Sequence, residues 1–350
     1  MPTRQLDART VTALVADATT APSMHNAQPW RFRYLAGPHA LLLLVDTERA
    51  MHRTDPDGRA LHIGCGAALL NLRAAAAHAG LIARVRPLPD PADPLLLAEV
   101  RFGHDPDGAA PGAADLRRLY PYLARRHTSR YPFEEEEPPA PVRAALRAAA
   151  AREGAELLFP GPWHIDAVLE LVHDAESRDA LDPSAAEDLT RWTRRGPWAA
   201  SAVDGVPEYA FGPTRRDGKA PLRDFAGRHR APGRDSSSFE EHPRLAVLST
   251  PGDRPADWLV AGQALERVLL EATAAGLATS LTSHPLESPD LRLLARDPVS
   301  GHGHVQMVLR LGYGPPGPAT PRRPVTDVLE VAEAVEVMGI AEVVEDAPGR

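Results

Sequence analysis

The sequence predicts an α+β protein of 350 residues in which one chain contains two related halves. The main evidence is an internal repeat: residues 66–81 and residues 262–277 align without gaps and share seven of sixteen residues, including both glycines of each copy. Apolar strand candidates precede and follow each copy, so the order strand, helix, strand occurs twice. This order favours a fused pair of halves that imitates a two-fold dimer. The alternative is a chance likeness between two alanine-rich helices.

In the first half, residues 8–19 are expected to form a helix, and residues 30–34 and 41–45 to form strands. The first repeat copy, 66–81, reads as a helix because its apolar residues recur every three or four positions and a glycine stands at its C-terminal cap. A strand ending at 100–103 completes this half. The Gly-, Pro- and Asp-rich segment 105–111 is expected to be a linker.

In the second half, residues 115–125 and 141–152 are expected to be helices, and residues 245–248 and 309–312 strands. Residues 196–241 contain many Gly, Pro, Arg and Ser residues with separate aromatic residues. A segment of this kind is a lid, a binding loop or a disordered region.

These elements divide the chain into a first half at 1–112, a second half at 113–330 that includes the lid segment, and a C-terminal tail at 331–350. The apolar and acidic stretch 331–344 within that tail is a candidate closing helix.

Composition excludes several classes of protein. The formal net charge of −8 argues against general nucleic-acid binding, which uses basic surfaces. The longest strictly aliphatic run, 41–45, is far too short to span a bilayer, and the N-terminus has no apolar signal region. A single cysteine permits no internal disulfide, which fits a reducing compartment. We therefore expect a cytoplasmic protein that acts on small molecules, without a bound metal.

The sharpest local signal is the segment 21–30, Ala-Pro-Ser-Met-His-Asn-Ala-Gln-Pro-Trp. Proline near both ends, with serine and asparagine between, predicts a rigid turn that carries polar side chains and free backbone amides. Such a turn can hydrogen-bond a flat heterocycle that has many donors and acceptors. The alternative is a plain connecting loop.

A second signal is the segment 125–130, Arg-Arg-His-Thr-Ser-Arg. Guanidinium groups bind a phosphate dianion bidentately, and hydroxyl groups add neutral donors, so this composition suits a phosphate site. The alternative is a basic surface segment paired with the acidic run 134–137. The cluster 320–324, Thr-Pro-Arg-Arg-Pro, has the same two interpretations.

Together these motifs resemble the nitroreductase superfamily of FMN-dependent enzymes, over roughly residues 8–330. Segment 21–30 matches the Ala-Pro-Ser-x-x-Asn-x-Gln-Pro-Trp element of that superfamily in full, and 125–130 resembles its Arg-Arg-Ser-x-Arg element. Their order is reversed here, and each occurs once. This arrangement, together with Asp55-Pro-Asp-Gly-Arg59 and Gly276-Leu277, is similar to the actinobacterial Acg-like subfamily, in which two halves are fused. The resemblance implies a nitroreductase-like fold, a monomeric pseudo-dimer with mixed or antiparallel sheets, one FMN site, and a lid at 196–241.

The resemblance also implies which residues bind the cofactor. Those matched to the FMN phosphate are Arg126, Thr128 and Arg130, with Arg322 or Arg323 closing the site. Those matched to the ribityl chain and the isoalloxazine edge are Pro22, Ser23, Met24 and Asn26. Gln28 either bonds the pyrimidine ring or braces the turn. The segment expected to bring backbone amides near flavin N5 is 284–287, in which Pro285, Leu286 and Glu287 are matched to the cofactor, and Ser288 follows where the family has glycine.

As an enzyme of this family, the protein would take a hydride from NAD(P)H and reduce a small organic acceptor. The flavin would carry the chemistry, so no obligate acid or base from the protein is needed. Two alternatives stay open at this point. One is a protein that stores FMN under a closed lid with little reductase activity, and the other is a flavin-modifying or biosynthetic enzyme of the same fold.

Overall fold

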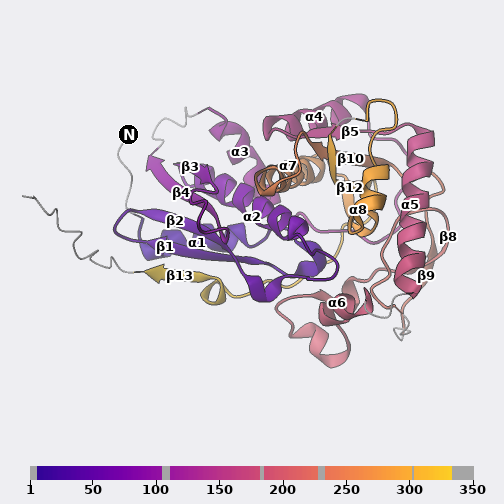
Figure 1. Cartoon of the computed structure of the whole chain (residues 1–350), viewed down its shortest axis with the longest axis horizontal. Coiled ribbons are helices and arrows are strands. Elements are labelled where there is room, and N and C mark those ends of the chain that lie inside the picture. Colours follow the sequence, from indigo (N-terminus) through magenta and orange to yellow (C-terminus); the bar gives the residue numbers. More distant parts are fainter. Residues whose placement is uncertain (1–5, 105–110, 182–184, 228–232, 302, 333–350) are drawn as a thin grey trace, which may run out of the picture.

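The structure is a computed structural model that describes residues 6–104, 111–181, 185–227, 233–301 and 303–332. Its two larger sheets flank a pair of central helices, α2 (Arg59–His78) and α7 (Pro255–Ala274), with one sheet on each side of the pair (Figure 1). The first sheet has the order β13 (Leu329–Ala332), β1 (Trp30–Leu35), β2 (Ala40–Val45), β4 (Leu96–His104) and β3 (Leu81–Pro87). The second has the order β5 (Glu156–Leu158), β10 (Leu245–Thr250), β12 (His304–Gly312) and β11 (Ala278–Thr282).

The two sheets repeat one topology. The order β1-β2-β4-β3 in the first matches β5-β10-β12-β11 in the second, and all of these neighbours are antiparallel. The β2–β4 pairing shifts register between Leu43 and Leu44, and the β10–β12 pairing shifts between Leu248 and Ser249, which is the same place in each strand. Chance likeness between two helices does not explain a matched sheet order and a matched irregularity. The expected duplicated α+β architecture is confirmed.

Helices α2 and α7 cross at the two glycines that begin the repeat. A Cβ atom on Gly66 would overlap the carbonyl oxygen of Leu259, and one on Gly262 would overlap the carbonyl oxygen of Ile63. Leu259 and Ile63 occupy matching positions of the repeat, so the contact is reciprocal, as in a two-fold interface between identical subunits. Glycine is therefore required at both positions for the helix backbones to approach this closely.

Helices pack against both sheets. In the first half, α1 (Ala8–Ala18) and α2 form one core with the first sheet, and α3 (Ala113–Leu119) packs on α2. In the second half, α4 (Ala140–Arg152) and α7 cover one face of the sheet, while α5 (Pro162–Leu181) and α8 (Pro289–Leu294) cover the other. Alternate residues of β10 accordingly enter different cores: Ala246 and Leu248 face α7, whereas Leu245 and Val247 face α5.

The N-terminus of α2 is fixed by a carboxylate that precedes it. Asp55 accepts hydrogen bonds from the amides of Ala60 (2.8 Å) and Leu61 (2.9 Å), which have no partner within the helix. Among the described residues, only α2 is long and apolar enough by composition to cross a bilayer, with a mean hydropathy of 1.3. That window is 89% buried inside the protein, as expected for the central helix of a core.

The segment expected to be a lid, 196–241, consists mainly of irregular chain. Its short strands β7 (Val206–Pro207), β8 (Thr214–Asp217) and β9 (Ser236–Ser238) form two small pairs, in which β7 joins β6 (Thr193–Arg194) and β8 joins β9. The sequence did not predict α5 or the helix that follows it, α6 (Ala185–Arg191), and both lie in the region where the resemblance is weakest.

Two other expectations need correction or lie outside the described residues. The helix expected at 115–125 ends at Leu119 and continues as a 3-10 turn at Tyr120–Tyr122, because Pro121 cannot donate to a longer α-helix. Residues 331 and 332, expected in a closing helix, belong to strand β13, which pairs in parallel with β1. The rest of that stretch, and all of the expected linker except residue 111, lie outside the described residues.

Candidate functional site

A cavity lies where the two halves and the lid segment meet, and it encloses about 1160 Å³ when the space open to solvent is counted. Its apolar walls include Ile63, Val172, Leu265, Leu281 and Met307. Its lining also includes four arginines, Arg126, Arg130, Arg223 and Arg322, and three histidines, His25, His127 and His284. The cavity therefore combines an apolar interior with an excess of cationic groups.

Most of the residues predicted from the sequence line this cavity. Those that do are Pro22, Ser23, Met24, Asn26, Arg126, Thr128, Arg130 and Arg322. Those outside its wall are Gln28, Arg323, Pro285, Leu286 and Glu287. The structure thus brings together the segments 22–26 and 126–130 and residue Arg322. The first two are about one hundred residues apart in the chain, and Arg322 is about two hundred residues further on.

The turn at 22–29 has an unusual backbone. His25, Asn26 and Gln28 have φ values of 48°, 56° and 54°, in the left-handed region that costs non-glycine residues conformational energy. Side chains of the turn hold this shape. The Ser23 hydroxyl accepts a bond from the Gln28 amide (2.9 Å), and Asn26 Nδ2 donates to the carbonyls of Gly205 and Pro321 (both 3.0 Å). The turn is therefore fixed both by the lid segment and by the chain that leads to β13.

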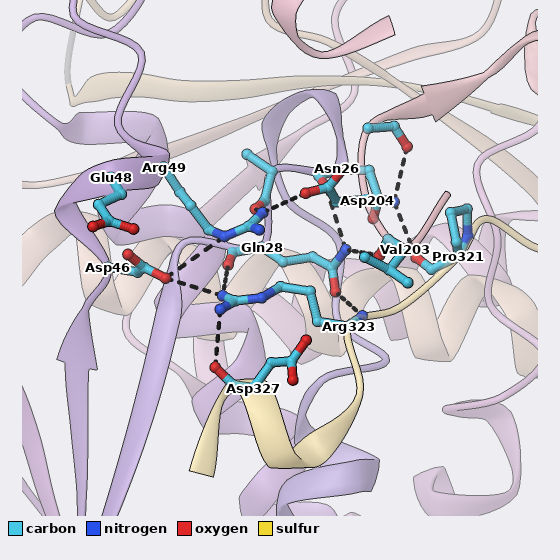
Figure 2. A network of polar contacts seen from close by, with 12 residues as sticks. Asn26, Gln28, Asp46, Glu48, Arg49, Val203, Asp204, Pro321, Arg323 and Asp327 are labelled. Carbon is cyan, nitrogen blue, oxygen red and sulfur yellow. Dashed lines mark hydrogen bonds and ion pairs between the residues drawn. The ribbon is translucent and has the colours of Figure 1, made fainter. Parts of the chain in front are cut away.

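Gln28 and Arg323 brace this turn from behind (Figure 2). Gln28 is fully buried; its Nε2 donates to the Val203 carbonyl (2.9 Å) and its Oε1 accepts from the Arg323 amide (2.9 Å). The guanidinium of Arg323 pairs with the buried carboxylate of Asp46 (3.1 Å) and donates to the Gln28 carbonyl (3.3 Å). Of the two roles expected for Gln28, its contacts in this structure correspond to bracing the turn. The guanidinium of Arg323 pairs with Asp46 and does not line the cavity.

Two arginines, the buried Arg126 and the partly buried Arg322, converge at one end of the cavity. Nη2 of Arg126 (3.1 Å) and Nη2 of Arg322 (2.9 Å) both donate to the carbonyl of Thr20, and Nη1 of Arg322 donates to Oδ1 of Asn26 (3.1 Å). Burial and the nearby Arg126 charge lower the pKa of Arg322 to about 9, so it remains a cation at neutral pH. A dianion placed against this pair would relieve the repulsion between them.

One carboxylate lies behind these arginines. Glu266 on α7 is fully buried, and its Oε1 lies 3.4 Å from Nε of Arg126. Neither carboxylate oxygen has a hydrogen-bond donor of good geometry among the described residues, and Asn71 is the other polar side chain nearby. Burial raises the pKa of Glu266 to about 7, against a smaller opposing effect of Arg126. This end of the cavity therefore carries a net positive charge of one to two at neutral pH.

Arg130 connects the cavity to the lid segment. Its Nη1 donates to the Ala210 carbonyl (3.0 Å), and its guanidinium lies 4.8 Å from the ring centroid of Phe225. Burial lowers the pKa of Arg130 to about 10, which leaves it charged at neutral pH. Arg130 is thus a lid contact as well as a residue of the cavity wall.

The turn at 284–287 is held close to the cavity, but only His284 lines it. The Leu286 side chain is buried in the core under α5 and α8. The amides of Leu286 and Glu287 donate to the carbonyls of Ser283 (2.7 Å) and His284 (3.3 Å). Because these amides are engaged within the turn, their expected contact with a ligand stays a prediction.

The sequence did not single out several residues of the cavity wall. His25 lies within the recognised turn, and His284 begins the recognised 284–287 segment, yet neither was assigned a role. Arg223 and Phe225 come from the irregular lid segment, where no periodicity or motif surrounds them. Proximity to the cavity for these two residues follows only from the tertiary fold.

Comparison with known proteins places this geometry in a family. Over 310 residues the chain is 35% identical to "Putative NAD(P)H nitroreductase Rv3131" of Mycobacterium tuberculosis, covering 88% of this chain and 86% of that protein. Over 331 residues it is 32% identical to "Putative NAD(P)H nitroreductase acg" of the same organism, covering 91% and 95%. No protein-family model matches the chain.

Among solved structures, the nitroreductase NfnB from Mycobacterium smegmatis in complex with NADPH has a TM-score of 0.33 at 16% identity, covering 57% of this chain and 89% of that one. This likeness is too distant to carry an argument. The two full-length relatives are sufficient by themselves, and they confirm the resemblance drawn from segments 21–30 and 125–130. The chain belongs to the NAD(P)H nitroreductase family.

Proposed function

We propose that the protein binds one FMN in this cavity and works as an NAD(P)H-dependent oxidoreductase that reduces a small organic acceptor. The observation that carries the proposal is the convergence of Arg126 and Arg322 at one end of a largely apolar cavity. The names of the two relatives supply the reductant and the reaction class.

The residues present fit FMN in both their charge and their shape. A phosphate dianion suits Arg126 and Arg322, whose only nearby carboxylate, among the described residues, is Glu266. A flat ring system suits the apolar walls formed by α2, α7 and β12, where Ile63, Leu265 and Met307 lie. The strained turn at 22–26 also lines the cavity.

Bound FMN would supply hydride acceptance from NAD(P)H and its delivery to the acceptor. The chain's own residues would do the rest. Arg126 and Arg322 hold the phosphate, and Asn26 orients Arg322 through its Oδ1. The lid residues Val206, Leu222 and Phe225 line the cavity and would limit the entry of water around a bound cofactor. Exclusion of water would separate the reacting groups from solvent. No acid or base from the protein is required for this role.

The experiment that tests this function is cofactor analysis followed by anaerobic reduction. The purified protein, reconstituted with FMN, is expected to hold one FMN per chain, and NADH or NADPH is expected to remove its visible absorption. Binding of FAD in preference to FMN, or two flavins per chain, would contradict the proposed site. Reduction by dithionite but by neither nicotinamide nucleotide would contradict the proposed reductase activity while leaving flavin binding intact.

A further inference from the structure

A chain of polar contacts runs along one side of the cavity and ends in a histidine at each end. Nη1 of Arg223 lies 3.0 Å from Nε2 of His25, and Nη2 of Arg223 lies 3.2 Å from Oδ2 of Asp179. The same carboxylate oxygen lies 2.6 Å from Nε2 of His284. The four residues come from the strained turn, the lid segment, α5 and the 284–287 turn. Both histidines line the cavity.

The contact with Arg223 determines where the proton of His25 resides. A guanidinium has donors only and stays charged at any ordinary pH, so Nε2 of His25 must accept its hydrogen bond. An imidazole that accepts at Nε2 is neutral and carries its proton on Nδ1. Burial, followed by the charges of Arg223 and Arg130, lowers the pKa of His25 well below its usual value, which agrees with a neutral ring.

The Nδ1–H group of His25 then faces no acceptor. His25 is only 7% exposed, and Nδ1 has no hydrogen-bond partner among the described residues. An unsatisfied buried donor costs about 1–3 kcal/mol, and such groups are rare in folded proteins. The residue also holds a left-handed backbone with φ 48°. Two unfavourable features at one cavity-lining residue are typical of a position that a ligand completes.

The ring of His25 is held at a fixed angle. Its centroid lies 5.4 Å from that of Phe225, with the two planes at 83°. Phe225 in turn lies under the Arg130 guanidinium. With Nε2 bound to Arg223 and one face set by Phe225, the imidazole cannot rotate without breaking contacts on the lid. Its free donor therefore has a defined direction.

We propose that His25 is a ligand-recognition residue that donates from Nδ1 to an acceptor atom of a flat heterocycle in the cavity, and that Arg223 is the positioning residue that fixes this tautomer. The acceptor is a carbonyl oxygen or an unprotonated ring nitrogen. This inference rests on the proposed function, because the heterocycle belongs either to FMN or to the nicotinamide nucleotide that follows it.

The first test measures the tautomer in the FMN-free protein and does not depend on activity. Two-bond ¹H–¹⁵N NMR spectra of labelled protein distinguish Nδ1–H, Nε2–H and doubly protonated rings, and H25N identifies the signals of His25 by their loss. We expect a neutral ring with Nδ1–H at pH 7, and a partial or complete change to Nε2–H in R223Q. A doubly protonated or Nε2–H ring in the wild type would overturn the proposal.

The second test compares two amide substitutions at position 25. In H25N the amide lies close to the place of Nδ1, and asparagine tolerates the left-handed backbone better than most residues do. In H25Q the longer side chain places its amide near Nε2, so the bond with Arg223 is kept and the donor to the ligand is lost. R216Q, at an exposed lid arginine that pairs with Asp217, is the control for effects on the lid.

Affinity is measured in two arms: FMN binding to the FMN-free protein, and NADP⁺ or NAD⁺ binding to the FMN-loaded protein. Loss of one neutral hydrogen bond predicts a weakening of about three- to tenfold in H25Q in one arm, and that arm identifies the ligand. H25N and R216Q should remain within about twofold. Equal weakening in H25N and H25Q, or no change in either arm for H25Q, would overturn the proposal. Failure of the wild type to bind FMN would instead contradict the proposed function.

Discussion

Replacing Glu266 with glutamine is expected to change how the stability of the ligand-free protein depends on pH. The carboxyl of Glu266 is fully buried and its pKa is raised by desolvation from 4.5 to about 7. The native state therefore keeps this proton over a pH range in which the unfolded chain has released it. In that window the folded state binds more protons, so the free energy of unfolding falls as pH rises.

The sign and size of the effect follow from the two pKa values. Below about pH 4.5 both states are protonated and Glu266 has no effect, whereas above about pH 7 its full penalty is present. A shift of about 2.5 units corresponds to about 3 kcal/mol at 1.36 kcal/mol per unit. Glutamine has no proton to release. The stability of E266Q relative to the wild type should therefore increase by about 2–3 kcal/mol between pH 5 and pH 8.

Urea unfolding of the FMN-free protein at several pH values, followed by circular dichroism, measures this difference. The interaction with Arg126 is already contained in the native-state pKa of about 7, and the contacts of the neutral side chain are a constant contribution that cancels when pH values are compared. E271Q is the matched control, because it neutralises a carboxylate on the same helix that pairs with Arg118 near the surface. A difference between E266Q and wild type that stays constant within about 0.5 kcal/mol from pH 5 to pH 8 would refute the reasoning.

Four further predictions follow from the fold and the site. R126A should weaken FMN binding about ten- to a hundredfold, as measured by fluorescence titration. R125A removes an exposed arginine that stacks on Tyr122 and should change FMN binding little; equal effects of the two variants would contradict a phosphate contact. G262A should destabilise the protein by about 3 kcal/mol in chemical unfolding because its Cβ meets a helix backbone, whereas G103A, which meets only Ile82 at an ordinary distance, should cost less than about 1 kcal/mol. Sedimentation should show a monomer, since the two halves already supply the paired central helices; a predominant dimer would count against this. Limited proteolysis within 196–241 should slow when FMN is bound, and unchanged cleavage would mean that the segment does not close over the cofactor.

The repeat was the part of the fold most accessible to sequence reasoning. Gly66 and Gly262 were recognisable because a glycine inside an apolar helix indicates a close approach, and both glycines occur at the same register. Strands and helices with clear periodicity, such as β2 and α1, also fall where the pattern placed them. Strand β13 was missed because its short pairing with β1 joins residues about three hundred positions apart, and no local pattern encodes that contact.

The same limit applies to the cavity. Arg126 and Asn26 could be named because each stands in a compact motif, yet the role of Asn26 as a holder of Arg322 depends on a contact across most of the chain. Arg323 has the same local sequence context as Arg322, and only the position of Asp46 determines which of the two faces the cavity. Arg223 reaches His25 from an irregular segment, where charge alone carries no information about its partner.

The duplication also explains why one cavity, and not two, is expected to hold a cofactor. The turn at 22–29 lies between α1 and β1. Its counterpart in the second half is the connection between α4 and β5, which consists of only the few residues around Glu153 and Gly154. In the first half, Gly64 on α2 leaves room for Ser23 of the turn; the matching residue on α7 is Val260, whose side chain meets Gly154.

The arginines at this second position are already engaged by a carboxylate. The buried carboxylate of Glu153 pairs with Arg73 and with Arg267 at 2.6 Å each. Glu153 thus bonds both arginines at this position. At the cavity, the carboxylate of Glu266 approaches only Arg126, at 3.4 Å, and not Arg322. A short connection, a filled glycine position and the engagement of both arginines by Glu153 distinguish this position from the cavity. The two-fold symmetry of the fold is therefore kept in its helices and sheets, while the binding chemistry is confined to one side of the central helix pair.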